Sequence, residues 1–297
     1  MIRRTVPQKT ISKQISLSGV GLHTGRHVNI TFKPAPADTG LVFVRDDIDG
    51  DNLINAHIKY ISNTDRGTNL DNGLFRIHTS EHVLAAITGL DIDNCFICLD
   101  GPEVPIMDGS SKFFINALEK AKIVEQNVLR EEFFPSEPIS YICEDTGSKI
   151  SILPDDNYRV NTLVDYKTRV LGEQEASINH ISEFKNEISS ARTFSFLHEL
   201  ETLLENGLIK GGDLNNAIVY VDKPLAESNM DILKKAFNKE SISVTPNGIL
   251  DNLDLHYPNE AARHKLLDVI GDLALIGMKI RGKVVAEKPG HSINAKF

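Results

Sequence analysis

The 297-residue sequence has no apolar stretch long enough to span a bilayer, and it has no low-complexity tract. The first residues, MIRRTVPQKT, carry positive charge but are not followed by the apolar segment of a secretory signal peptide. Hydrophobic residues make up 41% and charged residues 25%, which is the balance of a globular protein. We therefore expect a cytoplasmic protein without a membrane span, long enough for two domains.

Positive charge is also in short supply. The formal net charge is -9, whereas a nucleic-acid-binding protein usually carries an excess of Lys and Arg. We therefore expect no nucleic-acid partner. An anionic ligand would have to meet a local cluster of basic side chains.

Cysteine is rare, with only Cys95, Cys98 and Cys143 in the chain. An odd number without a signal peptide argues against a disulfide framework. Cys95 and Cys98 form a C-x-x-C pair, but they lie in NCFICLD, which has the apolar composition of a β-strand. Residues three apart on a strand point to opposite faces, so we expect two buried core thiols and no shared metal.

Two enzyme motifs are missing as well. The sequence contains no G-x-S-x-G elbow, which argues against an acyl-hydrolase with a serine nucleophile. The glycine-bearing turn GVGLHTG lacks the spacing of a phosphate-binding P-loop.

The pattern that is present alternates between strand-like and helix-like segments. HVNITF places Val28, Ile30 and Phe32 on one face of a strand at period two. Helices are predicted for EHVLAAITGL, SSKFFINALEKA, FLHELETLLENG and the segment from about residue 259 to 277. The hydroxyls of Thr79 and Ser80 are placed to cap the first of these helices.

The segment REEFFPSEPIS marks the predicted domain boundary, because its charges and two prolines follow a predicted helix. The expected domains are residues 1–130 and 131–297. A turn followed by an alternating strand occurs twice, at 24–34 and at 146–154. Such a pattern also arises by chance; if it reflects duplication, it indicates two similar α/β halves with a cleft between them, a common place for a site.

The longest predicted helix carries His264, Asp268 and Asp272 at intervals of four residues, so these side chains lie along one stripe. Apolar residues surround both acids, and a buried carboxylate needs a compensating partner. A divalent metal held by His264 and Asp268 would supply it. A solvated acidic stripe or a hydrogen-bonded His–Asp pair explains the same spacing, because so short a motif is not specific.

A second cluster, Glu81 and His82, lies at the start of a predicted helix. His82 is a candidate third ligand and Glu81 a candidate proton acceptor, since three ligands with one open position are typical of a catalytic zinc site. The favourable interaction of a glutamate with the helix dipole accounts for Glu81 equally well. His291 becomes a candidate proton donor only if Asp272 orients its imidazole.

Seven longer motifs, taken in order, resemble the UDP-3-O-acyl-N-acetylglucosamine deacetylases, which are zinc-dependent amide hydrolases of lipid A biosynthesis. They are GVGLHTG, TSEHVLAAITGLDIDN, PEVPIMDGSS, ARTFSF, GLIKGGDLNNAIVYVD, ARHKLLDVIGDLALIG and KPGHSIN, and they cover nearly the whole chain. The resemblance implies an α+β fold of two similar domains. Each domain packs a sheet against helices in a layered sandwich, with the active site at the domain junction.

The resemblance also implies a role for individual residues. The implied catalytic roles are Zn²⁺ ligation by His82, His264 and Asp268, general-base catalysis by Glu81, general-acid catalysis by His291 with support from Asp272, a hydroxyl near the oxyanion from Thr193 and a cation at the substrate from Lys265. Whether His291 or Glu81 returns the proton to the leaving amine stays open. The implied substrate contacts are His23, Phe194, Leu197, Leu200, Gly212, Ala217 and Val219.

An apolar passage for an acyl chain is implied for the segment from Phe196 to about Val221. Each CH₂ buried there contributes about 0.8 kcal/mol. An ordinary helix-to-strand core has the same composition, so the residues alone do not distinguish the two interpretations.

The implied reaction is hydrolysis of the N-acetyl group of UDP-3-O-(3-hydroxyacyl)-N-acetylglucosamine to the free amine and acetate. The UDP-linked substrate is then the partner, transient contact with the inner membrane surface is allowed, and no obligatory protein partner is inferred. Two alternatives stay open. The chain is the deacetylase half of a fusion with a hydroxyacyl dehydratase, or a non-catalytic module that binds a nucleotide sugar.

Overall fold

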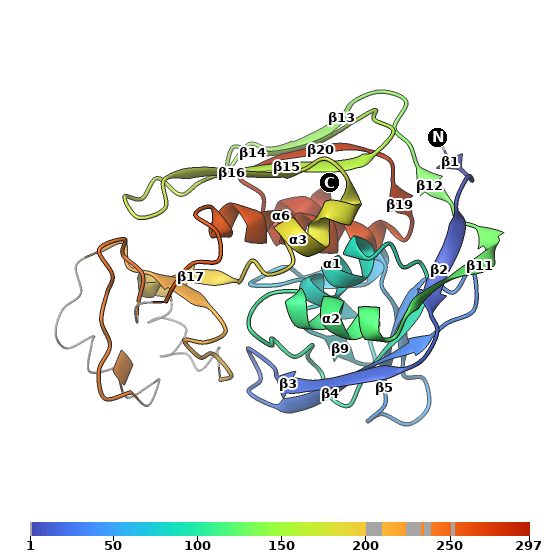
Figure 1. Ribbon diagram of the computed structural model, residues 1–297, viewed down its shortest axis with the longest axis horizontal. Coiled ribbons are helices and arrows are strands. Elements are labelled where there is room, and N and C mark those ends of the chain that lie inside the picture. Colours follow the sequence, from blue (N-terminus) through green and yellow to red (C-terminus); the bar gives the residue numbers. More distant parts are fainter. Residues whose placement is uncertain (1, 200–209, 224–232, 235–238, 251–252) are drawn as a thin grey trace.

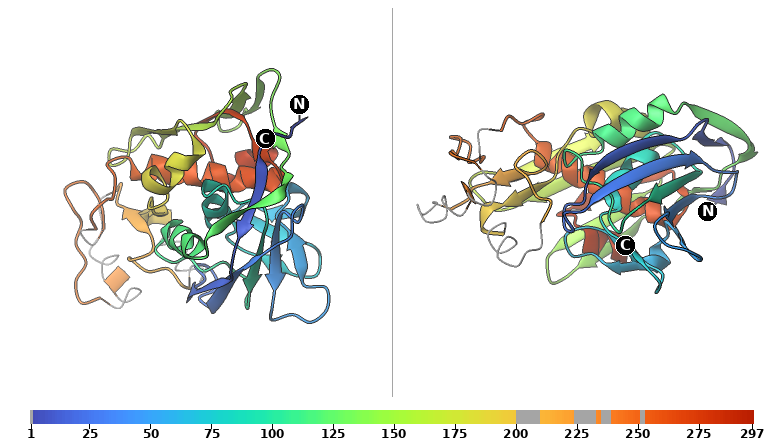
Figure 2. Two further views of the ribbon diagram at one scale, coloured as in Figure 1. Left: turned by 45° about the vertical axis from the view of Figure 1, so that its right-hand side comes forward. Right: turned by 90° about the horizontal axis from the view of Figure 1, so that it is seen from below.

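The computed structural model describes residues 2–199, 210–223, 233–234, 239–250 and 253–297 (Figure 1). Two five-stranded sheets form the outer layers, and the main helices lie between them (Figures 1 and 2). The first sheet has the spatial order β3 (Ile15–Val20), β4 (His27–Pro34), β10 (Cys95–Leu99), β5 (Leu41–Arg45) and β6 (Leu53–Asn55). The second has the order β13 (Ile139–Cys143), β14 (Ser148–Leu153), β20 (Gly282–Glu287), β15 (Tyr158–Asp165) and β16 (Glu173–Ile178).

The two sheets share one topology. In each, the strand that is fifth in chain order lies in the middle, parallel to the third strand and antiparallel to the second. The repeated pattern at 24–34 and 146–154 corresponds to β4 and β14, which occupy equivalent positions. The expectation of two similar α+β halves is therefore confirmed. We propose the boundary between them near residue 130, as predicted from the sequence.

Smaller sheets and helices complete the described part of the chain. The smaller sheets are β1 (Ile2–Arg3) with β12 (Glu132–Phe133) and β19 (Lys279–Ile280), β2 (Pro7–Ile11) with β11 (Ile123–Leu129), β7 (Ile61–Asn63) with β8 (Asn69–Asp71) and β9 (Arg76–Ile77), and β17 (Phe194–Phe196) with β18 (Ile218–Tyr220). The helices are α1 (Glu81–Gly89), α2 (Lys112–Lys120), α3 (Phe184–Glu187), α6 (Glu260–Leu273), α7 (His291–Lys296), η1 (Ile58–Tyr60), η2 (Ile181–Glu183) and η3 (Ala274–Ile276). Among the described residues, no helix is both long and apolar enough to cross a membrane.

The strand predictions rest on burial at alternate positions, and the structure confirms them. Val28, Ile30 and Phe32 of β4 are fully buried, and their neighbours in the strand point away from the core. Cys95 and Cys98 lie buried in β10, and burial raises the pKa of the Cys95 thiol to about 12. One continuous apolar core contains residues of both five-stranded sheets, so the two halves share their interior.

The predicted capping of α1 is wrong. Ser80 is the N-cap residue, but its side chain makes no capping bond. Its hydroxyl donates instead to the carbonyl oxygen of Thr68, and the Thr79 hydroxyl donates to Glu103. Every residue of α1 is buried, so these hydroxyls have neighbouring segments rather than solvent around them and bond to those. The helix predicted from Phe196 falls largely on residues 200–209, which lie outside the described residues.

Helices α1 and α6 pack against each other in the middle layer, and a glycine permits their contact. A Cβ atom at Gly271 would lie 2.1 Å from the carbonyl oxygen of Glu81. Any larger side chain at this position must therefore push the backbones of the two helices apart. The same contact places the start of α1 beside the last turn of α6.

Gly271→Ala is expected to lower the free energy of unfolding by about 1–3 kcal/mol, because the added methyl group overpacks the α1–α6 contact. Denaturant-induced unfolding measures the change. Gly290→Ala is the matched control, since no heavy atom lies within 4 Å of the Cβ position there. Equal stability of the two variants would contradict this account of the helix contact.

Candidate metal centre

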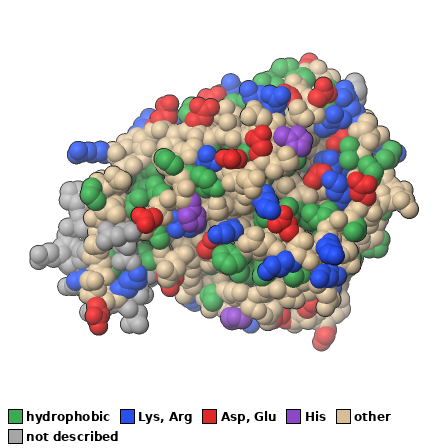
Figure 3. Space-filling view, viewed as in Figure 1, with side chains coloured by type: hydrophobic (Ala, Val, Ile, Leu, Met, Phe, Trp, Pro, Cys, Tyr) green, Lys and Arg blue, Asp and Glu red, His purple; other side chains and the backbone are tan. Residues whose placement is uncertain are grey.

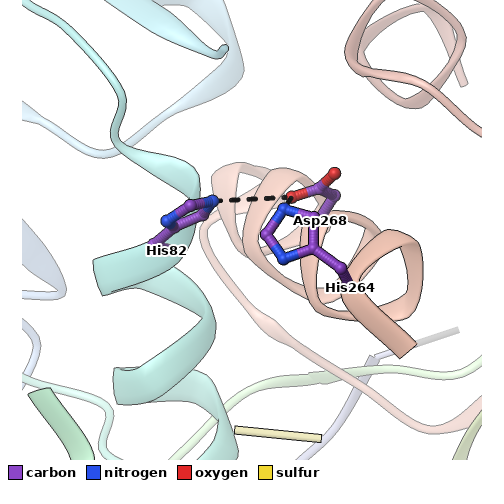
Figure 4. Close-up of side chains that lie close together, drawn as sticks. All are labelled: His82, His264 and Asp268. Carbon is purple, nitrogen blue, oxygen red and sulfur yellow. Dashed lines mark ion pairs between the residues drawn. The ribbon is translucent and has the colours of Figure 1, made fainter. Parts of the chain in front are cut away.

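Three predicted ligands meet between α1 and α6. His82 comes from the first turn of α1, and His264 and Asp268 lie one turn apart on α6 (Figure 4). One ligand atom from each lies within 4.8 Å of the other two. The Asp268 Oδ1 atom is 3.9 Å from the Nε2 atom of His82 and 3.5 Å from that of His264. The His82 and His264 rings meet edge to face, with centroids 5.0 Å apart.

Asp268 has the charge and the free oxygen that a cation requires. Asp268 Oδ1 is buried and has no hydrogen-bond partner among the described residues, whereas its Oδ2 atom accepts a bond of 2.7 Å from Lys265 Nζ. An orphaned carboxylate oxygen is costly unless an ion or donor completes it. Burial alone would raise the pKa of Asp268, but Lys265 and the surrounding histidines outweigh it and hold that pKa well below its usual range. The carboxylate is therefore charged.

Both imidazoles are neutral, which is the form that binds metals. Burial lowers the pKa of His82 to about 3, and burial also lowers the pKa of His264. The Nδ1 atom of His264 lies 3.1 Å from the carbonyl oxygen of Ala191. Since a carbonyl only accepts, Nδ1 carries the proton and Nε2 presents its lone pair to the centre.

Glu81 lies beside these ligands without joining them. Its Oε2 atom accepts a hydrogen bond of 2.9 Å from the backbone N–H of Thr68, and its Oε1 atom is 3.9 Å from His291 Nε2. Burial raises the pKa of Glu81 to about 7, with His291 opposing the rise. A carboxyl with such a pKa exchanges protons readily near neutral pH.

His291 is oriented by Asp272, as the sequence hypothesis required. The Nδ1 atom of His291 is 2.9 Å from Asp272 Oδ2. Burial by itself lowers the pKa of His291, but the carboxylates of Asp272 and Asp268 outweigh it and raise that pKa to about 9. The ring is therefore an imidazolium whose Nε2 proton faces Glu81 and Asp268.

Two members of this network were not predicted. Thr68 donates its hydroxyl to Asp272 Oδ1 and its backbone N–H to Glu81, and Asn294 donates to Asp272 Oδ2 at 2.8 Å. Thr68 thus joins the candidate base to the support of the candidate acid. Neither residue carries a charge. Asn294 ends the motif KPGHSIN and Thr68 lies outside the quoted motifs, and in both cases only the bond to Asp272 in the folded chain reveals the role.

A cavity of about 230 Å³ opens onto the metal centre. The predicted residues that line it are Glu81, His82, His264, Asp268, His291, His23, Thr193, Phe194, Lys265, Gly212, Ala217 and Val219. Leu197 is not among its lining residues; it packs with Val219 in an apolar cluster, and its contact with the substrate stays a prediction. Leu200 lies outside the described residues.

Phe194 and Lys265 form one side of this cavity. The Phe194 ring meets the His264 ring nearly perpendicularly at 6.2 Å, and Lys265 Nζ lies 5.6 Å from the Phe194 centroid. The backbone N–H of Thr193 donates to the carbonyl oxygen of Gly109 at 2.8 Å. This bond holds the backbone that carries the Thr193 hydroxyl. A larger cavity of about 670 Å³ lies elsewhere, lined by the ion-paired Arg4 and Arg130 among others, and none of the three predicted ligands lines it.

Two imidazoles and a carboxylate beside an acid–base pair in a cavity are typical of metal-dependent hydrolases. Comparison with known proteins agrees with this class. The model of one family, described as LpxC, UDP-3-O-acyl N-acetylglycosamine deacetylase, matches residues 8–237 and 226–297. The chain belongs to this family, and the resemblance seen in its motifs is confirmed.

Individual relatives are similar over nearly the whole chain. A bifunctional enzyme LpxC/FabZ of Chlorobaculum tepidum is 45% identical over 98% of this chain and 63% of its own length. The protein of the same name from Bacteroides thetaiotaomicron is 42% identical, again over 98% and 63%. A UDP-3-O-acyl-N-acetylglucosamine deacetylase of Myxococcus xanthus is 38% identical over 98% of this chain and 84% of its own length. The chain thus spans less than two thirds of the bifunctional relatives.

Zn²⁺ is expected to stabilise the protein through this centre. At a free concentration of about 100 times the dissociation constant, a ligand that binds only the folded state adds about 2.7 kcal/mol to the free energy of unfolding. His264→Ala should abolish the increase, whereas His27→Ala, at an exposed position of β4, should retain it. Denaturant-induced unfolding with and without Zn²⁺ measures both. An increase that survives in His264→Ala would place the metal elsewhere.

Proposed function

We propose that the protein is a zinc-dependent hydrolase that removes the N-acetyl group of UDP-3-O-(3-hydroxyacyl)-N-acetylglucosamine in lipid A biosynthesis. The observation that carries the proposal is the meeting of His82, His264 and Asp268 beside Glu81 and His291. Membership of the deacetylase family supports it, because the relatives that give the family its name are deacetylases.

The residues present fit Zn²⁺. Two neutral imidazoles and one charged carboxylate are a ligand set common in catalytic zinc sites, and the orphaned Asp268 Oδ1 atom lacks the positive partner that a metal supplies. When bound, the ion would act as a Lewis acid that polarises the amide carbonyl and lowers the pKa of a water molecule. His82, His264 and Asp268 would hold it.

Glu81 is the proposed general base. Its carboxylate takes the proton of the attacking water. With a pKa of about 7, the group is partly deprotonated at neutral pH and is still basic enough to accept that proton. The Thr68 N–H keeps one oxygen in place, which leaves Oε1 directed towards His291. The base is thereby positioned without serving as a ligand.

His291 is the proposed general acid. Its imidazolium, held by Asp272, gives the Nε2 proton to the departing glucosamine nitrogen, so the C–N bond breaks with a neutral amine as product. Alternatively, Glu81 returns its acquired proton to this nitrogen and His291 keeps its own. The Thr193 hydroxyl and the Lys265 ammonium line the cavity where negative charge develops on the former carbonyl oxygen. The products are acetate and the free amine, with the 3-O-acyl ester intact.

The proposed substrate contacts follow the cavity wall. His23 and Phe194 are proposed to contact the sugar, and Gly212, Ala217 and Val219 to border the acyl chain. The UDP-linked acylated sugar is the proposed partner. The face shown in Figure 3 mixes acidic and basic side chains. The lack of a nucleic-acid partner stays a prediction. The cytoplasmic location stays a prediction.

A second assignment concerns the architecture rather than the chemistry. The bifunctional LpxC/FabZ relatives are longer than this chain, which supports the alternative that it is the deacetylase part of such a fusion. The other alternative, a module that only binds a nucleotide sugar, gives no chemical role to the neighbouring Glu81 and His291. The reaction itself separates a deacetylase, fused or not, from a module that only binds.

Acetate release from the UDP-linked acylated sugar is the direct test of the proposed function. We expect turnover with about one Zn²⁺ per chain, loss of turnover after chelation and recovery when Zn²⁺ is added back. Elemental analysis and an acetate assay on the same samples measure both quantities. Binding without acetate release would support the non-catalytic module, and full activity of metal-free protein would reject zinc dependence.

Glu81→Gln is expected to lower kcat by at least about a hundredfold, because general-base catalysis contributes on this order. Zn²⁺ content should stay at the wild-type level, since Glu81 is not one of the three ligands. Glu119→Gln, at an exposed ion pair with Lys185, is the control and should keep wild-type kcat. Normal turnover of Glu81→Gln would show that the base has been misassigned.

A further inference from the structure

A fully buried carboxylate, Glu103, lies behind the cavity wall rather than in it. Its Oε1 atom accepts a hydrogen bond of 2.9 Å from the backbone N–H of His23. Its Oε2 atom accepts from both the backbone N–H and the hydroxyl of Thr24, at 2.8 and 2.7 Å. Three donors of one turn thus converge on one carboxylate, in a place where an unpaired charge would be very costly.

The turn that carries His23 is shaped to receive this carboxylate. Gly25 N–H donates to the carbonyl oxygen of Gly21, which closes the turn, and Gly21 N–H donates to that of Arg26. A Cβ atom at Gly21 would lie 2.4 Å from Glu103 Oε2, so only glycine lets the carboxylate approach. The φ angle of Gly21 is not positive, so the requirement for glycine comes from this contact and not from backbone strain.

Glu103 also contacts the segment that leads into α1. Its Oε1 atom accepts a bond of 3.3 Å from the hydroxyl of Thr79, two residues before Glu81. The backbones join there as well, since His78 N–H donates to Pro102 and Val104 N–H donates to His78. One side chain therefore links the His23 turn to the start of the helix that carries the candidate base and a candidate ligand.

The His23 turn also contacts the segment of Gly211 and Gly212, which forms another wall of the cavity. The carbonyl oxygen of Leu22 accepts a hydrogen bond of 3.0 Å from Gly211 N–H, and a Cβ at Gly211 would lie 2.2 Å from the Gly21 carbonyl oxygen. Gly212, the next residue, lines the cavity together with Leu22 and His23. A displacement of the turn would therefore move both of these walls relative to α1.

We propose that Glu103 is a positioning residue for substrate binding: by bonding to His23, Thr24 and Thr79, it holds the His23 turn at a fixed place relative to Glu81 and His82. The inference rests on the proposed function, because His23 is a proposed substrate contact. Glu103 does not touch the substrate. Its effect is on the shape of the cavity, and the metal ligands do not depend on it.

Two variants test the proposal by different routes. Glu103→Gln keeps the size of the side chain but places amide hydrogens against donors that need an acceptor. Gly21→Ala keeps the carboxylate and displaces it by the added methyl group. For both, we expect KM for the UDP-linked acylated sugar to rise about tenfold or more, because small displacements of positioning groups have effects of this order. The value of kcat should stay within about threefold, and Zn²⁺ content should not change.

A second readout does not depend on turnover. The backbone amides of His23 and Thr24 are expected to exchange hydrogen for deuterium faster in Gly21→Ala and Glu103→Gln than in the wild type, because their acceptor has moved or changed. Thr24→Val removes only one donor and serves as the test if the larger changes prevent folding. The two amides should then exchange faster than in the wild type. Unchanged amide exchange in all three variants would overturn the proposal.

Glu132→Gln is the matched control for a purely structural effect. Glu132 is a buried carboxylate that does not line the cavity, bonded to Thr5, Arg130 and Arg281. It should lose stability while KM stays at the wild-type value. If Glu103→Gln and Gly21→Ala behave like this control, or if they lose Zn²⁺, the positioning role is wrong. A wild-type protein that releases no acetate would reject the proposed function instead, and the amide exchange would still decide the role of Glu103.

Discussion

The contact between α1 and α6 at Gly271 is the constraint on which the centre depends. His82 comes from one helix and His264 and Asp268 from the other, so the ligand atoms converge only at the separation that a glycine allows. The apolar core on both sides of this contact excludes water from it. That exclusion makes both histidines neutral and raises the pKa of Glu81 to about 7. The packing of α1 against α6 therefore determines both the position of the ligands and the pKa values around them.

Charge in the centre is balanced by arrangement rather than by solvent. Asp268 is compensated by Lys265 on one oxygen and has the other directed at the two imidazoles. Asp272 is compensated by His291, Thr68 and Asn294. The two acids are one turn apart on α6 and have different surroundings, so one is suited to a metal and the other to a histidine. A regular helical spacing thus supports two distinct tasks.

Periodic features of the fold could be predicted from the sequence, and tertiary hydrogen bonds could not. Alternation of apolar residues identified β4, and the long apolar stripe identified α6, because burial on one face repeats with the period of the element. The predicted capping of α1 was wrong because Thr79 and Ser80 bond to segments that only the folded chain brings near. In the site, charged and imidazole side chains were recognisable by type, whereas Thr68, Asn294 and Glu103 have meaning only through their partners.

The repeated sheet topology has a consequence for how the centre comes into being. Each half contributes one central helix, and neither helix carries the whole ligand set. A chain in which only one half has folded therefore offers either a single imidazole or one imidazole with a carboxylate. Tight binding of an ion therefore requires that both halves have folded and packed against each other. Occupancy of the centre would then indicate that folding of the chain is complete.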